Sequence, residues 1–337
     1  YATEFRHADG STAYVYSAYN KKTVLRHFEW MRAYGLDGVF VQRFAVETVP
    51  PVNLNYFTTV LGHSREGANR AGRTYAVMYD LSGLREGETE HVIEDWKLLV
   101  NRMRIGRDSN DRAYLRHQGK PVVAVWGIGF NDDRKYTLDE CAKLIDFLKN
   151  DPDFGGCTVM IGVPTYWRTL DRDCVADAKL HEVMLGADIV SPWAVGRYRD
   201  LDGVALHAEE QLGPDLEWCR EHGKEYLPVV FPGFSWHNMF PDSPLNLIPR
   251  LGGQFLTKQY EAAIGAGATM VYQAMFDEVD EGTAIYKCTN DPPAGESQFV
   301  TYEGLPSDHY LKLVGQQTQC LREKLESGDA PGCYAKP

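Results

Sequence analysis

Short apolar runs alternate with amphipathic stretches along most of this 337-residue chain. This alternation is typical of repeated βα units rather than of an all-α or all-β protein. The expected strands are 38–41, 75–79, 122–126, 158–162, 187–190, 226–231 and 269–273. The expected helices include 22–34, 90–105, 138–149, 204–222, 252–265 and 307–325. Thr137 and Glu140 form a capping-box pattern at the start of one helix.

Seven strands nearly complete an α/β barrel, and residues 13–16 could supply an eighth. The sequence therefore predicts a (β/α)8 TIM-type barrel with an irregular or missing first strand. A doubly wound open sheet is the alternative. No linker rich in Pro, Gly or Ser interrupts the alternation, so residues 1–337 are expected to form a single domain with a polar C-terminal tail, 326–337.

Charge and hydropathy exclude several classes of partner. The formal net charge is −12, so the chain lacks the basic surface that nucleic acid or anionic lipid requires. No apolar run approaches the roughly 18 residues of a membrane span. We expect a soluble monomer that acts on a neutral substrate.

Seven cysteines are present without a CxxC pair or a zinc-like His/Cys spacing, so no metal site is expected. Cys141, Cys157 and Cys219 are interpreted as small buried hydrophobes. Cys320 and Cys333 flank the polar C-terminal segment and could form a disulfide in an oxidising compartment. Tyr1 stands where an initiating Met would be, which suggests a processed product or a fragment. A secreted or periplasmic location is expected.

Polar and aromatic residues gather directly after the predicted strands, where the βα loops of a barrel build the active site. Flat aromatic rings suit the CH faces of sugars, and planar polar groups suit their hydroxyls. The sequence therefore predicts a sugar-binding site. The candidate substrate-binding residues are Gln42, Arg43, Tyr79, Trp126, Tyr166, Trp167, Trp193, Arg197, Trp236 and His237.

Several of these residues have simpler interpretations. Trp126 could only cover the barrel core, His237 could cap the next helix, and Arg43 could pair with a core acid. Other enzyme classes find little support. The Gly127-Ile128-Gly129 segment lacks the third glycine of a phosphate-binding loop, and no GxSxG nucleophile elbow is present.

An acidic run follows the last predicted strand, with Asp277, Glu278, Asp280 and Glu281 in five consecutive positions. Two carboxylates held close together tend to differ in pKa, which supplies an acid and a base for cleaving a glycosidic bond. A solvated acidic turn or a calcium loop is the alternative.

The segment 276–285, Phe-Asp-Glu-Val-Asp-Glu-Gly-Thr-Ala-Ile, resembles the Trp-Asn-Glu-Trp-His-Glu-Gly-Thr pattern of the glycoside hydrolase family 99 endo-α-mannosidases and related family 71/99-like proteins. Gly253-Gln254-Phe255 and Glu261-Ala262-Ala263 add to the resemblance. Weaker similarity covers most of the chain in order. Here Asp277 replaces Asn, Val279 replaces Trp and Asp280 replaces His.

The resemblance implies a barrel and a retaining mechanism in which the sugar's 2-hydroxyl attacks the anomeric carbon and gives a 1,2-anhydro sugar. Glu278 would be the base and Glu281 the acid. We expect a cofactor-free hydrolase of an α-linked, mannan-like glycan, with Asp277 and Asp280 also contacting substrate. A carbohydrate-binding pseudoenzyme is the main rival. A calcium-dependent binding protein using Asp277, Asp280 and Glu281 is another.

Overall fold

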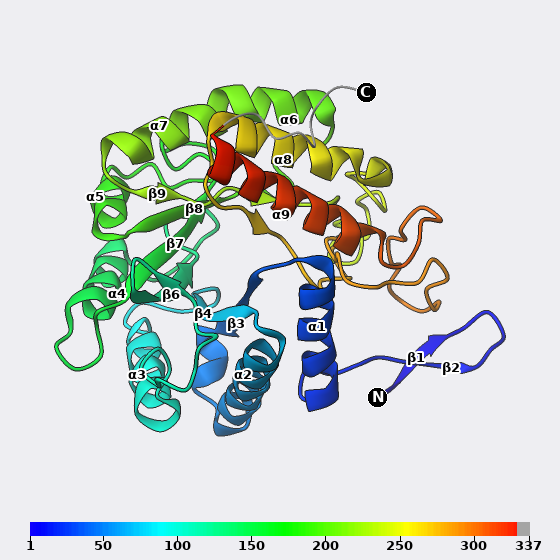
Figure 1. Ribbon diagram of the computed structural model, residues 1–337, viewed down its shortest axis with the longest axis horizontal. Helices are drawn as coiled ribbons and strands as arrows, with labels where there is room; N and C mark the ends of the chain where they lie inside the picture. The colour runs from blue at the N-terminus through cyan, green and yellow to red at the C-terminus, as the bar shows by residue number, and fades with distance from the viewer. Residues whose placement is uncertain (329–337) are drawn as a thin grey trace.

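The computed structural model describes residues 1–328, whose centre is a parallel sheet covered by helices (Figure 1). Its strands follow the order β3-β4-β6-β7-β8-β9, and neighbouring strands are parallel. They are β3 (Gly38–Phe44), β4 (Thr74–Asp80), β6 (Lys120–Trp126), β7 (Thr158–Pro164), β8 (Ile189–Trp193) and β9 (Glu225–Tyr226). The short β5 (Arg116–His117) pairs antiparallel with β6. The sequence therefore predicted the α/β class and the parallel order of these strands correctly.

The predicted strand 226–231 is divided in two. Pro228 lies between β9 and β10 (Val229–Val230), and proline has no N–H to donate to a neighbouring strand. β10 pairs in parallel with β11 (Tyr272–Gln273), which is all that remains of the predicted strand 269–273.

Helices cover the outside of this sheet (Figure 1). The α-helices are α1 (Lys21–Tyr34), α2 (Pro51–Ala71), α3 (Glu90–Leu98), α4 (Leu138–Asn150), α5 (Lys179–Gly186), α6 (Leu201–His207), α7 (Gly213–Glu221), α8 (Gln254–Ala266) and α9 (His309–Ser327). Short 3-10 helices lie at Ala45–Thr48 (η1) and Leu251–Gly253 (η4), and π-helical turns extend α3 (η2, Leu99–Met103) and α6 (η3, Ala208–Leu212). The predicted capping box of α4 is confirmed. No described helix has the length and apolar character needed to cross a membrane.

The sheet curves so that one face of its strands forms an interior core. Met78, Ala124, Met160, Ile189 and Leu227 are buried there together, and Phe40 and Tyr272 pack against them. The rings of Phe40 and Tyr272 lie 5.5 Å apart, although they come from the first and last strands of the curve. Side chains therefore bridge β3 and β11. Within residues 1–328, no backbone pairing joins these two strands.

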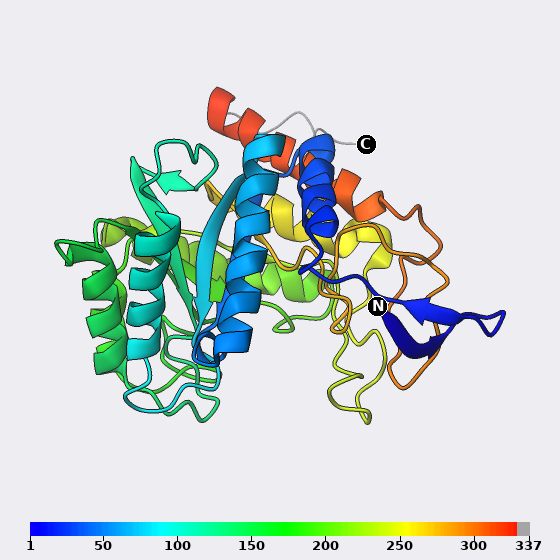
Figure 2. The same ribbon diagram turned by 90° about the horizontal axis from the view of Figure 1, so that it is seen from below.

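The predicted eighth strand at residues 13–16 is wrong. Residues Thr12–Tyr14 (β2) pair antiparallel with Ala2–Arg6 (β1), and this hairpin projects away from the sheet (Figure 2). Tyr14 and Val15 are exposed, so they do not face the interior of the sheet. The open edge of β3 remains partly exposed along its length, whereas every residue of the central strand β7 is buried.

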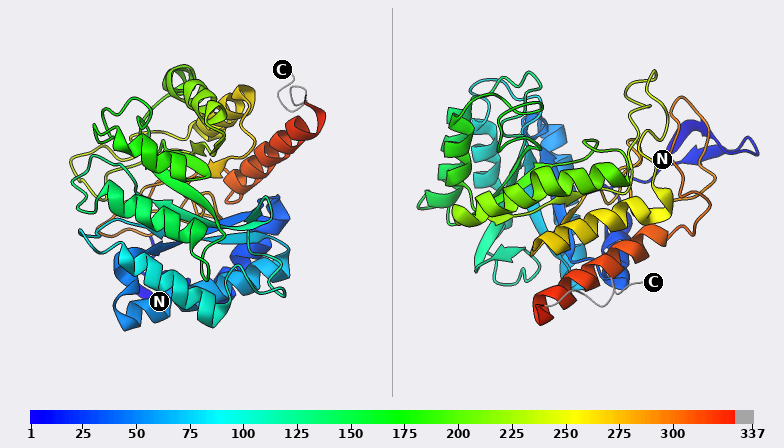
Figure 3. Two further views of the ribbon diagram at one scale, coloured as in Figure 1. Left: turned by 90° about the vertical axis from the view of Figure 1, so that its left-hand side faces the viewer. Right: turned by 90° about the horizontal axis from the view of Figure 1, so that it is seen from above.

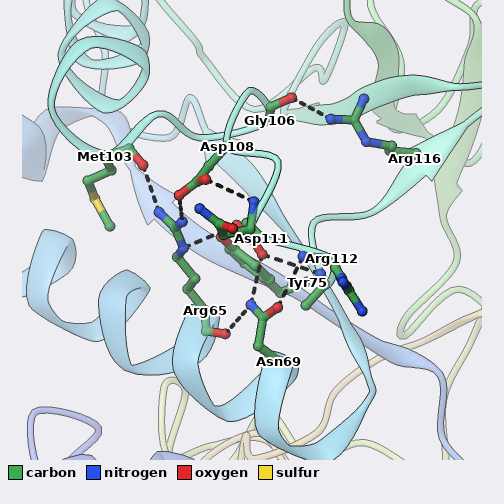
Figure 4. Close-up of polar contacts among 11 residues, drawn as sticks. Arg65, Asn69, Tyr75, Met103, Gly106, Asp108, Asp111, Arg112 and Arg116 are labelled. Atoms are coloured by element: carbon green, nitrogen blue, oxygen red, sulfur yellow. Dashed lines mark hydrogen bonds and ion pairs between the residues drawn. The ribbon is translucent and has the colours of Figure 1, made fainter.

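A polar network anchors the loop after η2 to α2 (Figure 4). Arg65 donates to the backbone oxygen of Met103 at 2.7 Å and also pairs with Asp108 and Asp111. Tyr75 donates to Asp111 at 2.6 Å. These contacts lie near the start of β4, at the end of the sheet opposite the acidic run, so they stabilise the scaffold rather than the candidate site.

The C-terminal helix lies alongside α8 (Figure 3). α9 extends to Ser327, so residues 326 and 327 of the predicted tail are helical, and residues 329–337 lie outside the described part of the chain. Cys320 on this helix is disulfide-bonded, and its predicted partner, Cys333, lies outside the described residues. Cys141, Cys157 and Cys219 are free and buried, as predicted.

Candidate active site

The loops that follow the strands gather at one end of the sheet, along the lower edge of Figure 2. At this end, strand register places Gln42 beside Met78, a residue of the interior core. Gln42 donates from Nε2 to Oδ2 of Asp80 at 2.7 Å, and the backbone N–H of Ser82 donates to Oδ1 of Asp80 at 2.8 Å. Asp80 is therefore a buried, oriented carboxylate at the mouth of the curved sheet. The sequence pattern indicated its neighbour Tyr79 instead.

Three partly exposed aromatic side chains form a wall at this mouth. The ring centroids of Trp126 and Trp193 lie 5.5 Å apart at 79°, and those of Trp193 and Tyr272 lie 6.4 Å apart at 55°. Gly162 makes room for this wall, because a Cβ at that position would come within 2.2 Å of the Trp126 ring. Trp126 Nε1 is buried, and it has no hydrogen-bond partner within residues 1–328.

The acidic run forms a loop whose ends are joined by backbone hydrogen bonds. Met275 donates to the backbone oxygen of Thr283 at 3.2 Å, and Ile285 donates to that of Phe276 at 3.1 Å. Gly282 has a φ of 69°, a left-handed conformation that favours glycine. The loop begins at Ala274, which is buried in the same apolar cluster against which Trp193, Trp236 and Tyr272 pack. The cluster therefore brings the acidic run and the aromatic wall together.

The two glutamates of this loop have different environments. Burial raises the pKa of Glu278, but Oε1 of its carboxylate accepts a hydrogen bond from Asp280 N–H at 2.8 Å, which opposes that rise. Burial, and then repulsion from Glu278, raise the pKa of Glu281 to about 7. A carboxyl group with a pKa near neutrality can donate a proton and later accept one. The two carboxyl groups of this loop therefore differ in their surroundings, and their catalytic roles stay a prediction.

The segment 235–238 holds the acidic run from one side. Ser235 N–H donates to the backbone oxygen of Glu281 at 2.8 Å. Asn238 Nδ2 donates to Oδ1 of Asp280 at 2.8 Å and to its backbone oxygen at 3.1 Å. Trp236 and His237 lie between these two anchors. His237 Nδ1 lies 2.8 Å from the backbone oxygen of Ser243 in its own loop, so it does not cap the next helix.

An aromatic cluster surrounds Asp277, and the sequence analysis missed it. Tyr16 donates to Oδ2 of Asp277 at 3.1 Å. The Tyr16 ring also contacts His27 at 5.4 Å and Tyr286 at 5.9 Å, and His27 contacts Phe276 at 5.2 Å. Burial lowers the pKa of His27, although the nearby Asp277 carboxylate opposes this effect. No local sequence pattern relates Tyr16 to a residue 261 positions away.

Three predicted substrate-binding residues lie outside the site. Arg43 and Tyr79 are fully buried on the outer face of the sheet, where both bond to Asp95 of α3. Successive strand residues point to opposite faces, so Gln42 and Asp80 face the interior while Arg43 and Tyr79 face the helices. Trp167 is also fully buried, with its ring 4.9 Å from that of Trp218. The simpler interpretation of Arg43, a pair with a buried acid, is the correct one.

Tyr166 and Arg197 belong to two neighbouring loops that Asp173 connects. Arg197 Nε donates to Oδ2 of Asp173 at 2.7 Å, and Tyr166 N–H donates to Oδ1 at 3.1 Å. Arg172 lies over the Tyr166 ring at 4.2 Å. Tyr166 and Arg197 are therefore fixed in place beyond β7 and β8. Within residues 1–328, no group of three or more His, Cys, Asp or Glu side chains is arranged to hold a metal ion.

Several solved structures with a similar fold are glycoside hydrolases or are named as glycoside hydrolase-like. A GH99 endo-α-mannosidase from Bacteroides thetaiotaomicron superimposes with a TM-score of 0.70 and 17% identity, covering 96% of this chain and 85% of that one. The chain is structurally similar to the family 99 endo-α-mannosidases.

Two other structures extend this likeness. A glycoside hydrolase-like protein gives a TM-score of 0.63 at 14% identity and covers 94% of this chain and 89% of its own. A glycoside hydrolase family 5 mannosidase from Rhizomucor miehei gives a TM-score of 0.53 at 10% identity and covers 91% of this chain and 90% of its own. No protein-family model and no curated protein matches the chain. The family resemblance noted in the sequence is thus confirmed for the fold.

Proposed function

We propose that this protein is a glycoside hydrolase that cleaves an α-linked, mannan-like glycan with retention of configuration. One observation carries the proposal: two carboxyl groups of unlike pKa lie on one anchored loop that adjoins an aromatic wall. The fold shared with glycoside hydrolases supports it. The aromatic wall would stack on the sugar, while Gln42 and Asp80 offer an amide and a carboxylate for its hydroxyls.

The proposed reaction has two steps. In the first, Glu278 takes the proton from the sugar's 2-hydroxyl, whose oxygen attacks the anomeric carbon, while Glu281 protonates the departing glycosidic oxygen. In the second, Glu281, now ionised, takes a proton from water, which opens the 1,2-anhydro ring, and Glu278 returns its proton to the 2-oxygen. The pKa of about 7 for Glu281 suits both roles.

Product release from defined glycans tests the proposal. We would incubate the protein with α-mannan oligosaccharides, α-glucans and N-glycans and detect products by mass spectrometry. The Glu281→Gln variant is expected to release product from these glycans about 10²–10⁴-fold more slowly. The Glu94→Gln variant is a matched control on the exposed surface of α3 and should retain full activity. EDTA treatment should have no effect on product release. A loss of activity with EDTA would favour the calcium-dependent alternative.

A carbohydrate-binding pseudoenzyme would give a different result. It would release no product from any glycan and would still lose sugar affinity in the Trp193→Ala variant. Isothermal titration with the same oligosaccharides distinguishes the two cases.

We also propose that the protein works as a monomer outside the cytoplasm. The disulfide at Cys320 supports the location, because such bonds persist in oxidising compartments. Periplasmic and culture fractions of the producing cells, probed for the protein, would test the location.

A further inference from the structure

Arg250 is a buried cation directly behind the acidic run. It precedes η4, and only 1% of its surface is exposed. Its guanidinium carbon lies 4.9 Å from the ring centroid of Tyr302 and 4.4 Å from that of Tyr310. No carboxylate within residues 1–328 forms an ion pair with it. Its charge is therefore stabilised by aromatic faces and backbone oxygens.

Those backbone oxygens belong to the residues that follow Glu281. Arg250 Nη2 donates to the oxygens of Gly282 and Ala284, each at 2.7 Å. Tyr302 donates to the same oxygen of Ala284 at 3.1 Å. Hydrogen bonds from a charged donor are roughly twice as strong as neutral ones, so this contact restrains the backbone firmly. Ser235 holds the oxygen of Glu281 itself.

A comparison with Arg43 shows what is unusual about this arrangement. Arg43 is equally buried, but Asp95 balances its charge through two hydrogen bonds. Burying an arginine without a carboxylate is costly. A neutral side chain could fill the space between Tyr302 and Tyr310, yet it could not draw the carbonyl groups of Gly282 and Ala284 towards one point.

We infer that Arg250 is a positioning residue for Glu281, which rests on the proposed function of that glutamate as acid and base. By fixing the carbonyl groups of Gly282 and Ala284, Arg250 sets the direction in which the chain leaves Glu281. This fixes where the Glu281 carboxyl group lies relative to the departing glycosidic oxygen. Displacement of about 1 Å in such a group can cost about 100-fold in rate.

The test compares Arg250→Met and Arg250→Lys with the control Arg43→Met, which also removes a buried arginine. For aryl glycosides with poor leaving groups, we expect Arg250→Met to lower kcat by about 10- to 100-fold with little change in KM. With activated aryl glycosides, the kcat of Arg250→Met should fall much less. Arg250→Lys should recover part of the rate with poor leaving groups. Arg43→Met should lower Tm without this dependence on the leaving group. Equal kcat values for folded Arg250→Met and the native protein would overturn the inference.

A second measurement does not depend on turnover. Infrared titration, with Glu281→Gln subtracted, reports the pKa of the Glu281 carboxyl group. That pKa should change in Arg250→Met and stay constant in Arg43→Met. If Arg250→Met does not fold, Arg250→Lys and Tyr302→Phe replace it, since Tyr302 shares the Ala284 oxygen. An unchanged pKa in the Arg250 variants would refute the positioning role. Absence of turnover by the native protein would refute only the proposed function.

Discussion

Replacing Glu281 with Gln should stabilise the protein at alkaline pH and have little effect at acidic pH. The folded environment raises the pKa of this carboxyl group from 4.5 to about 7. At low pH, both the folded and the unfolded states hold the proton, so burial of the carboxyl group adds no ionisation cost. Above pH 4.5, the Glu281 carboxyl group ionises in the unfolded chain, whereas in the folded protein it keeps its proton up to about pH 7. The cost therefore grows with pH and is complete above about pH 7.

The size of this effect follows from the two pKa values. One pKa unit corresponds to about 1.4 kcal/mol, so the full cost is about 3 kcal/mol. Proton linkage gives about 1 kcal/mol at pH 5 and about 3 kcal/mol at pH 8. Glutamine has nearly the same shape and carries no charge. The difference in free energy of unfolding between Glu281→Gln and the native protein should therefore widen by about 2 kcal/mol between these pH values, or somewhat less because solvent reaches the site.

Urea denaturation followed by circular dichroism measures this difference at pH 5, 6, 7 and 8. Glu94→Gln serves as the control, because Glu94 is exposed and its replacement should give a small difference with no comparable trend. A constant difference between Glu281→Gln and the native protein at all four pH values would mean that Glu281 ionises normally. In that case it would be a poor proton donor at neutral pH, and its proposed role as the acid would lose its physical basis.

Three further predictions concern the scaffold and the aromatic wall. Asp95→Asn should cost about 3–5 kcal/mol of stability, measured by urea denaturation, because it leaves Arg43 buried without its counter-charge. The folded fraction should keep its kcat, since neither residue reaches the site. Trp193→Ala should weaken oligosaccharide binding about tenfold in isothermal titration, because a lost stacking partner costs about 1–1.5 kcal/mol. Thr137→Ala should lower stability by about 1 kcal/mol, seen as a lower Tm, because the capping box with Glu140 is lost.

Features with a strong local signal were predictable from the sequence. The apolar runs that became β4, β6 and β7 have clear lengths and boundaries, and their predicted cores lie inside the observed strands. The acidic run was equally clear, since four carboxylates next to a buried strand are costly unless they serve a purpose. The family pattern then assigned the two roles within that run. These signals depend only on residues close together in the chain.

Features that depend on distant residues were not predictable in the same way. The sequence placed Tyr79 and Asp80 together at a strand end, but only the register with β3 shows which one faces the interior. Tyr16 meets Asp277 through a contact between opposite ends of the chain. Arg250 reaches the acidic loop from the segment before η4, and no pattern around it indicates that contact.

The contrast between the two glutamate variants tests the central claim most directly. Hydrolysis would be measured for aryl α-mannosides with good and poor leaving groups. The rate of hydrolysis by Glu281→Gln should fall about 10²–10⁴-fold with poor leaving groups and much less with activated ones, since only poor leaving groups need a proton to depart. Glu278→Gln should lose activity with both, because both kinds of substrate need the attack by the 2-hydroxyl. A 2-O-methyl substrate should resist cleavage for the same reason. Full activity of Glu278→Gln, or normal cleavage of the 2-O-methyl substrate, would contradict the proposed mechanism.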